Sequence, residues 1–163
     1  CFGSLRVMST RGIAAIVAIG LIIMAFSFRS TETPPQSSEI APTRTILVGG
    51  ATIRVQVVDT DASRQRGLSG IAGLADDEGM LFIFEEDGLY SFWMHEMRFS
   101  IDILWIDSEG TVVHLEKDLA PETYPQSFTP LSPARYVLEV AAGFSEAHGI
   151  HVGSRVILDQ NNE

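Results

Sequence analysis

The sequence predicts a mainly β domain, either a compact β-sandwich or a partly closed barrel, with about eight short strands and one or two short helices. Short apolar runs separated by turn residues recur from about residue 44 onward. Segments with the 3.6-residue apolar period of a helix are few. One apolar run near the N-terminus is longer than any strand, so the 163 residues are expected to form one domain preceded by an export segment.

The apolar run covers residues 12–28, GIAAIVAIGLIIMAFSF, and contains no charge. As a helix it would reach about 25 Å, the short end of a membrane span. Arg6 and Arg11 precede it and the first acidic residue is Glu32, which is the layout of an export segment that starts on the cytoplasmic side. We expect a transmembrane anchor or a signal peptide, and the length favours the anchor.

The two alternatives place the domain differently. A retained anchor makes the chain a single-pass protein of the cell membrane, with residues 1–11 in the cytoplasm and the C-terminal domain in the periplasm or extracytoplasmic space. Small residues at the −3 and −1 positions would instead allow cleavage after Ser27 and secretion into the periplasm. Met8 is a natural start, which would make residues 1–7 an upstream extension.

The part of the chain after the apolar run is acidic. Residues 29–43, rich in Ser, Thr and Pro, predict a disordered linker, followed by the β-domain over residues 44–159 and a tail over 160–163. Beyond Ser30 lie 21 acidic and 8 basic residues, a net charge of −13. That charge argues against nucleic acid as a partner. The only cysteine is Cys1, so the domain has no disulfide.

Three hairpins are expected from paired apolar runs around turn residues. They join residues 43–48 to 51–59, 80–84 to 89–94, and 101–107 to 111–116. Two later strands are expected over 134–142 and 154–158.

Helical signals are short. Asp59 or Thr60 is the expected N-cap of a helix over residues 61–68, and residues 141–149 predict one helical turn. Residues 118–133 contain four prolines and predict a long irregular loop, a kind of segment that often carries function.

Four sequence blocks carry a resemblance to a known family. RGLSG, DDEGMLFIF, FWMHEMRFSIDILWID and YVLEVAAGFSEAHGIHVGSRV occur in this order. Together they resemble the family catalogued as domain of unknown function 192, small bacterial and archaeal proteins that often have an N-terminal export segment. The resemblance covers most of residues 44–159. It implies a compact, jelly-roll-like β-domain and brings no established activity.

The chain departs from the family pattern at four positions. Family members often have Met, Arg, Pro and Asp at the positions that here hold Ser69, Ile71, Ser100 and Ser154. The replacement of Arg by Ile71 removes a charged group that could serve a ligand there.

The block at residues 92–102 gathers residues suited to a soft metal. On a regular strand, Trp93, His95 and Met97 would share one face, and imidazole and thioether groups bind Cu(I). Met80 would be a third ligand if the fold brings it close. The other interpretation is that Trp and Met pack in the core or at its rim while His95 lies at the surface.

Asp102 lies between apolar residues at the start of a strand expected to be buried. A buried carboxylate needs a partner, and Arg98, Arg66 and Arg135 are candidates. It is either a functional carboxylate in a cleft or a structural group held by an ion pair or by backbone N–H groups. Glu139 also interrupts an apolar strand, and if it met Asp102 the two would form a paired-carboxylate site of the glycosidase type.

We expect an exported, membrane-tethered domain that binds a small ligand or a protein partner in the cell envelope. The candidate binding residues are Asp102, Arg98, Trp93, Arg66 and Glu139. No cofactor is predicted, and the absence of nucleophile-elbow, phosphate-loop and HExxH motifs disfavours catalysis. Two alternatives are an envelope polymer hydrolase using Asp102 and Glu139, and a periplasmic Cu(I)-binding module.

Overall fold

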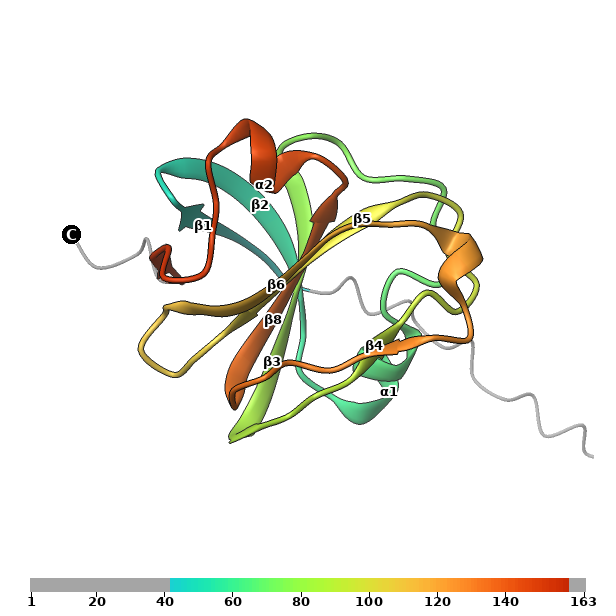
Figure 1. Cartoon of the computed structure of the whole chain (residues 1–163), viewed down its shortest axis with the longest axis horizontal. Helices are drawn as coiled ribbons and strands as arrows, with labels where there is room; N and C mark the ends of the chain where they lie inside the picture. Colours follow the sequence, from blue (N-terminus) through green and yellow to red (C-terminus); the bar gives the residue numbers. More distant parts are fainter. Residues whose placement is uncertain (1–41, 159–163) are drawn as a thin grey trace, which may run out of the picture. The chain divides into compact units, whose positions relative to one another are not determined.

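A seven-stranded half-barrel sheet, a two-stranded sheet and two short helices make up the part of the chain that the computed structural model describes, residues 42–158 (Figure 1). The large sheet has the strand order β6-β5-β8-β3-β2-β1-β9, and β4 pairs with β7. The strands are β1 Thr43–Val48, β2 Ala51–Val58, β3 Glu78–Gly88, β4 Phe92–Trp93, β5 Ile101–Ile106, β6 Val112–Leu119, β7 Ser127–Phe128, β8 Ala134–Ala141 and β9 Val156–Ile157. The helices are α1 Asp61–Arg66 and α2 Phe144–Ala147, with a 3₁₀ turn at Pro121–Thr123. A mainly β domain is therefore confirmed, and of the two expected architectures the topology matches the partly closed barrel.

Two of the three expected hairpins are present. Strands β1 and β2 are antiparallel, and Val48 pairs with Ala51 across Gly49 and Gly50. Both glycines have positive φ, 55° and 96°, which a tight two-residue turn requires and glycine adopts without strain. Strands β5 and β6 form the other hairpin.

The expected hairpin between residues 80–84 and 89–94 is wrong. Strand β3 pairs in parallel with β2 and antiparallel with β8, whereas β4 pairs with β7. Consecutive residues of β3, Met80, Leu81 and Phe82, are all buried, as in a central strand with both faces covered. The parallel pairing of β2 with β3 requires a crossover, and the segment that contains α1 supplies it.

The two edges of the half-barrel meet at one end. Val112 N donates to Ser154 O at 2.9 Å, and Gly153 N donates to Val112 O at 2.8 Å. Thr111 and Arg155 form a β-bridge beside these bonds. These contacts join the start of β6 to the segment that leads into β9, so they pair backbone groups that an open sheet edge would leave free.

Each face of the large sheet is buried by a different apolar cluster. On β5, Leu104 and Ile106 belong to a cluster that includes Phe144 of α2, and we call this side the α2 face. Ile103 and Trp105 point to the other side, the α1 face. The α1 face is covered by residues that follow α1 or belong to the small sheet and its neighbouring turn: Leu68, Met94 and Phe128. Figure 1 shows α1 beside β4 and apart from α2.

Helix α1 begins as expected. The Thr60 side chain accepts a hydrogen bond from Ser63 N, and the Ser63 hydroxyl in turn bonds the Thr60 backbone N–H, a capping box. The helix ends at Arg66, with Gly67 as its C-cap. Helix α2 forms within the helical turn expected over residues 141–149.

The N-terminal part of the chain lies outside the described residues. It contains the predicted anchor over 12–28 and most of the linker, and the predicted tail over 160–163 also lies outside the described residues. Thr43, assigned to the linker, already pairs with β2. Between residues 42 and 158, no helix is long and apolar enough to cross a membrane.

Candidate functional site

A cavity of about 730 Å³ lies on the α1 face, where α1, β3, the link to β4 and the turn after β4 come together. This volume is in the range of small-molecule sites. Five aromatic residues line it: Phe82, Phe84, Tyr90, Phe92 and Trp93. Its polar lining comes from Arg64, Gln65, Arg66, Ser69, Ser91, His95, Glu96 and Glu139.

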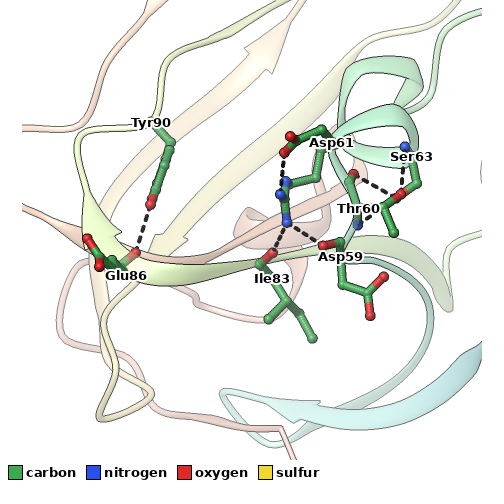
Figure 2. Close-up of polar contacts among 8 residues, drawn as sticks. Asp59, Thr60, Asp61, Ser63, Ile83, Glu86 and Tyr90 are labelled. Atoms are coloured by element: carbon green, nitrogen blue, oxygen red, sulfur yellow. Dashed lines mark hydrogen bonds and ion pairs between the residues drawn. The ribbon is translucent and has the colours of Figure 1, made fainter.

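One wall is held in place by Arg64 of α1. Its Nη1 donates to the carbonyl oxygens of Asp59 at 2.6 Å and Ile83 at 2.7 Å, and its Nη2 donates to the Asp61 carboxylate at 2.6 Å. Figure 2 shows these three acceptors converging on the donor nitrogens between α1 and β3. The guanidinium also lies over the Phe84 ring, 5.1 Å from its centre. Helix α1 is thereby fixed to β3.

The facing wall is held by Tyr90. Its hydroxyl donates to Glu86 O at 2.8 Å (Figure 2), and its ring stacks on Phe84 with centroids 3.5 Å apart. The indole N–H of Trp105 donates to Tyr90 O at 2.8 Å from within the core. Both the side chain and the backbone of Tyr90 are therefore fixed before any ligand arrives.

Two turns that line the cavity hydrogen-bond to each other. The Ser69 hydroxyl donates to His95 O at 3.0 Å, and Gly70 N donates to Glu96 O at 3.1 Å. Ser69, where the chain departs from the family pattern, therefore ties the two turns together. Glu96 has φ 55°, a left-handed conformation that costs energy for a residue with a side chain.

Residues 92–102 do not form the regular strand on which Trp93, His95 and Met97 would share one face. Strand β4 ends at Trp93, and a turn with the left-handed Glu96 intervenes before β5 begins at Ile101. Trp93 is 58% exposed at the rim of the cavity, with its ring 5.9 Å from that of His95. The alternation used to align Trp93, His95 and Met97 does not apply to this turn.

Glu139 lies on the cavity wall with its carboxyl group unpartnered. Its neighbours across the sheet are Met80 on β3 and Ile103 on β5, both apolar. The residue is 5% exposed, and its Oε2 has no hydrogen-bond partner. Burial raises the pKa of Glu139 to about 8, because the charged form loses its hydration. At neutral pH the group is mostly a neutral acid that can donate a hydrogen bond or release its proton to pair with a cation.

Asp102 is a structural carboxylate on the α2 face. It is fully buried and accepts hydrogen bonds from three backbone N–H groups: Asp118 at 3.0 Å, Gly143 at 3.4 Å and Ser145 at 2.9 Å. It thus joins the end of β6 to the start of α2. Of its expected interpretations, the bonding to backbone N–H groups is the one found, and it does not line the cavity.

The arginines proposed as partners of Asp102 lie elsewhere. Arg98 is exposed, Arg66 lines the cavity, and Arg135 pairs with Asp87 at 2.8 Å. None of the ion pairs within residues 42–158 includes Asp102.

Asp102 and Glu139 do not meet. Asp102 pairs with Val140 and Glu139 pairs with Ile103, so their side chains leave the sheet on opposite faces. The paired-carboxylate arrangement expected for a polymer hydrolase is therefore absent at these two residues.

The proposed copper ligands are only partly brought together. His95 and Met97 both line the cavity, whereas Met80 is buried in the cluster of the α1 face and is not part of the cavity wall. In the described part of the chain, no three or more His, Cys, Asp or Glu side chains gather in a way that could hold a metal ion.

Several wall residues could not be recognised in the sequence. Arg64, Phe84 and Tyr90 belong to different segments, and the crossover between β2 and β3 brings them together. One signal was present in the sequence: the N-cap residues directly after the strand that ends near Val58 predict a short helix. Such a helix packs against the strand that follows it, here β3.

Two solved structures are similar to the described domain. One is a candidate transcription regulator from Sinorhizobium meliloti 1021, with 27% identity, a TM-score of 0.67, and coverage of 71% of this chain and 93% of that chain. The other is a protein of unknown function from Novosphingobium aromaticivorans DSM 12444, with 24% identity, a TM-score of 0.67, and coverage of 70% of this chain and 84% of its own. The second likeness bears on the fold alone.

No curated protein matches the chain. The family DUF192, described as an uncharacterized ACR family, matches residues 44–158, which include all of the cavity wall. The four sequence blocks and this match agree, and the chain belongs to the DUF192 family.

Proposed function

We propose that this chain is a binding protein whose cavity holds a small organic ligand, with Glu139 as the polar anchor. The observation that carries the proposal is the buried, unpartnered carboxyl oxygen of Glu139 on the cavity wall. A buried polar group without a partner costs free energy, and such groups are rare in folded proteins. A ligand that completes the hydrogen bonding of Glu139 would recover that cost.

The shape of the cavity supports the same proposal. Phe82 and Phe92 pack edge to face at 4.9 Å, and Phe84 and Tyr90 stack, so the aromatic walls hold one another in position. Walls fixed in this way bury an apolar ligand with little loss of side-chain freedom. Polar groups set among hydrophobic and aromatic side chains are the usual way in which such sites orient their ligand.

Binding without catalysis is the favoured activity. Asp102, the expected second carboxylate, faces the other side of the sheet and is already bound to three backbone N–H groups. Oε2 of Glu139 has no hydrogen-bond partner, so within the described residues no second group is paired with it for acid–base catalysis.

We place this binding activity in the cell envelope. The uncharged apolar run over residues 12–28 and the preceding arginines support a membrane tether with the domain on the extracytoplasmic side. Protease treatment of intact spheroplasts tests this location. Digestion of the domain from outside is expected, and protection until the membrane is lysed would contradict it.

A fragment screen on the full chain tests the binding proposal. Thermal shift and ligand-detected NMR are expected to find small aromatic compounds that raise the Tm of the wild type. Glu139→Leu, which fills the site with an apolar side chain, should lose these hits. Leu131→Ala changes a residue that is 87% exposed and does not line the cavity, so it should keep them. Hits that survive Glu139→Leu unchanged would refute the proposal.

A further inference from the structure

We infer that the ligand of this cavity carries a positive charge, an ammonium or guanidinium group, which pairs with Glu139 while its apolar body lies against the aromatic walls. This inference rests on the proposed function and names the chemical class of its ligand. Three observations carry it, and each concerns a different part of the cavity wall.

The first observation is the environment of the Glu139 carboxyl group. Its cross-strand neighbours, Met80 and Ile103, offer neither charge nor hydrogen bonds, and its Oε2 is unpartnered. A carboxylate in such surroundings is stabilised most by an opposite charge, because Coulomb attraction is strong where water is excluded. A cation entering the cavity would supply that charge.

The second observation is the aromatic wall itself. The faces of aromatic rings carry negative electrostatic potential and attract cations. The Arg64 guanidinium already lies 5.1 Å from the centre of the Phe84 ring, so this wall accommodates a cation in the folded protein. Phe92 and Trp93 extend the aromatic surface of the cavity.

The third observation is that the positive groups of the cavity leave Glu139 free. Arg64 directs its donors to Asp59, Asp61 and Ile83, and its charge is balanced by the Asp61 carboxylate at 2.6 Å. Arg66 is exposed, so water screens its charge. Glu96, exposed like Arg66, adds a second carboxylate to the lining and offsets the charge of Arg66.

Binding of the cation is accompanied by loss of one proton. Glu139 is protonated at neutral pH because burial raises its pKa to about 8. When the ammonium enters, the O–H bond of Glu139 breaks, the proton leaves to solvent, and the carboxylate pairs with the ligand. Affinity should therefore rise with pH and level off above about pH 8. The other charged or titratable groups that face the cavity are Arg64, Arg66, Tyr90, His95 and Glu96.

Matched pairs of probes of equal shape test the inference. A panel of aryl and alkyl primary amines, such as 2-phenylethylamine and tryptamine, is titrated into the full chain by calorimetry. The corresponding alcohols, such as 2-phenylethanol and tryptophol, are titrated in parallel. At pH 8 the best amine should bind at least about tenfold more tightly than its alcohol, and at pH 7 its binding should release close to one proton, as measured in buffers of different ionisation enthalpy.

Two variants test whether the amine preference and the proton release come from Glu139. Glu139→Gln keeps the shape of the side chain and removes its charge, so it should lose most of the amine preference and release no proton. Leu131→Ala changes an exposed residue outside the cavity and should keep both the amine preference and the proton release. Equal binding of the two probes by the wild type, or an amine preference that is undiminished in Glu139→Gln, overturns the inference.

Failure of this inference differs from failure of the proposed function. If neutral fragments bind in a Glu139-dependent way while every amine is rejected, the cation is wrong and the binding cavity stands. If the amines bind but Glu139→Leu has no effect on any ligand, both are wrong.

Discussion

Asp102 and Glu139 lie one register position apart on the adjacent strands β5 and β8, and their side chains leave the sheet on opposite faces. Both are buried carboxylates, yet three backbone N–H groups satisfy Asp102, whereas Oε2 of Glu139 is unpartnered beside a cavity. In this protein, therefore, the buried carboxylate with an unpartnered oxygen is the one that indicates a binding site, and the fully hydrogen-bonded one is structural.

Glu139→Gln should change how stability depends on pH. The folded wild type holds a proton up to about pH 8, whereas the unfolded chain releases it near the ordinary value of 4.5. The contribution of Glu139 to the stability of the wild type should therefore be largest below pH 4.5, fall as pH rises to about 8, and then level off. At about 1.4 kcal/mol per pKa unit, Glu139→Gln should gain on the order of 3–5 kcal/mol relative to the wild type between pH 4.5 and pH 8.

Urea unfolding at a series of pH values measures this difference. His148→Gln, at an exposed residue outside the cavity, is the control and should follow the wild type. Parallel stability curves for the wild type and Glu139→Gln would show that Glu139 titrates normally in the folded protein.

Asp102→Asn should destabilise the fold and leave the cavity intact. The amide cannot accept all three N–H bonds, and its NH₂ group would face other donors, so we expect a loss of roughly 2–4 kcal/mol in the free energy of unfolding. Ligand binding by the folded fraction should be unchanged, because Asp102 lies on the α2 face. Asp87→Asn, at an exposed carboxylate paired with Arg135, should cost less than about 1 kcal/mol. Wild-type stability of Asp102→Asn would contradict the structural role.

Substitutions at the two tryptophans should have different effects: one should weaken ligand binding and the other should lower the free energy of unfolding. Trp93 is 58% exposed and lines the cavity, so Trp93→Ala should weaken ligand binding while changing stability by less than about 0.5 kcal/mol. Trp105 is fully buried and donates to Tyr90 O, so Trp105→Phe should cost roughly 2–3 kcal/mol. Chemical denaturation and ligand titration of both variants check this division, and tight binding by Trp93→Ala would remove Trp93 from the site.

Arg64→Lys should loosen α1 from β3. A lysine has one nitrogen and cannot reproduce the fork that reaches the carbonyl groups of Asp59 and Ile83 together with Asp61, so we expect a cost of about 1–2 kcal/mol and weaker ligand binding. Arg54→Lys is the matched control, because that arginine pairs with carboxylates at the exposed surface and its replacement should cost less than about 0.5 kcal/mol. Equal stability of the two variants in urea would argue against a special role for Arg64.

Gly79→Ala should disturb the strand pair that carries Glu139. A Cβ at Gly79 would lie 2.9 Å from Glu139 O, a backbone atom that cannot move without shifting β8. We expect a loss of roughly 1–3 kcal/mol. Gly73→Ala, where no atom lies within 4 Å of the added Cβ, should be neutral or slightly stabilising. Thermal unfolding distinguishes them, and a Gly79→Ala variant as stable as Gly73→Ala would contradict the steric argument.

Local features of the fold were predictable from the sequence. The turn at Gly49 and Gly50, the hairpin around residues 108–110 and the capping of α1 by Thr60 each depend on a few neighbouring residues. The hairpin expected between residues 80–84 and 89–94 failed because an apolar strand does not identify its partners. Strand β3 gains more buried surface between β2 and β8 than it would beside the two-residue β4.

The candidate site was predictable only in part. Glu139, Trp93 and Arg66 were recognisable as unusual residues, and all three line the cavity. Asp102 attracted the same attention because burial of a carboxylate is visible in the sequence, whereas its hydrogen-bond partners come from β6 and the region of α2, which are distant along the chain.

The family, the mainly β character of the domain and its short-range turns and caps could be predicted from the amino-acid sequence, because they follow from sequence motifs, apolar patterning and the conformations open to a few residues. Which carboxylate lies beside a cavity depends on the tertiary structure. Strand pairing sets the face on which each side chain emerges, and the segments that cover that face decide whether it finds a hydrogen-bond partner. Those segments satisfy Asp102 and leave Oε2 of Glu139 without a partner at the wall of the cavity.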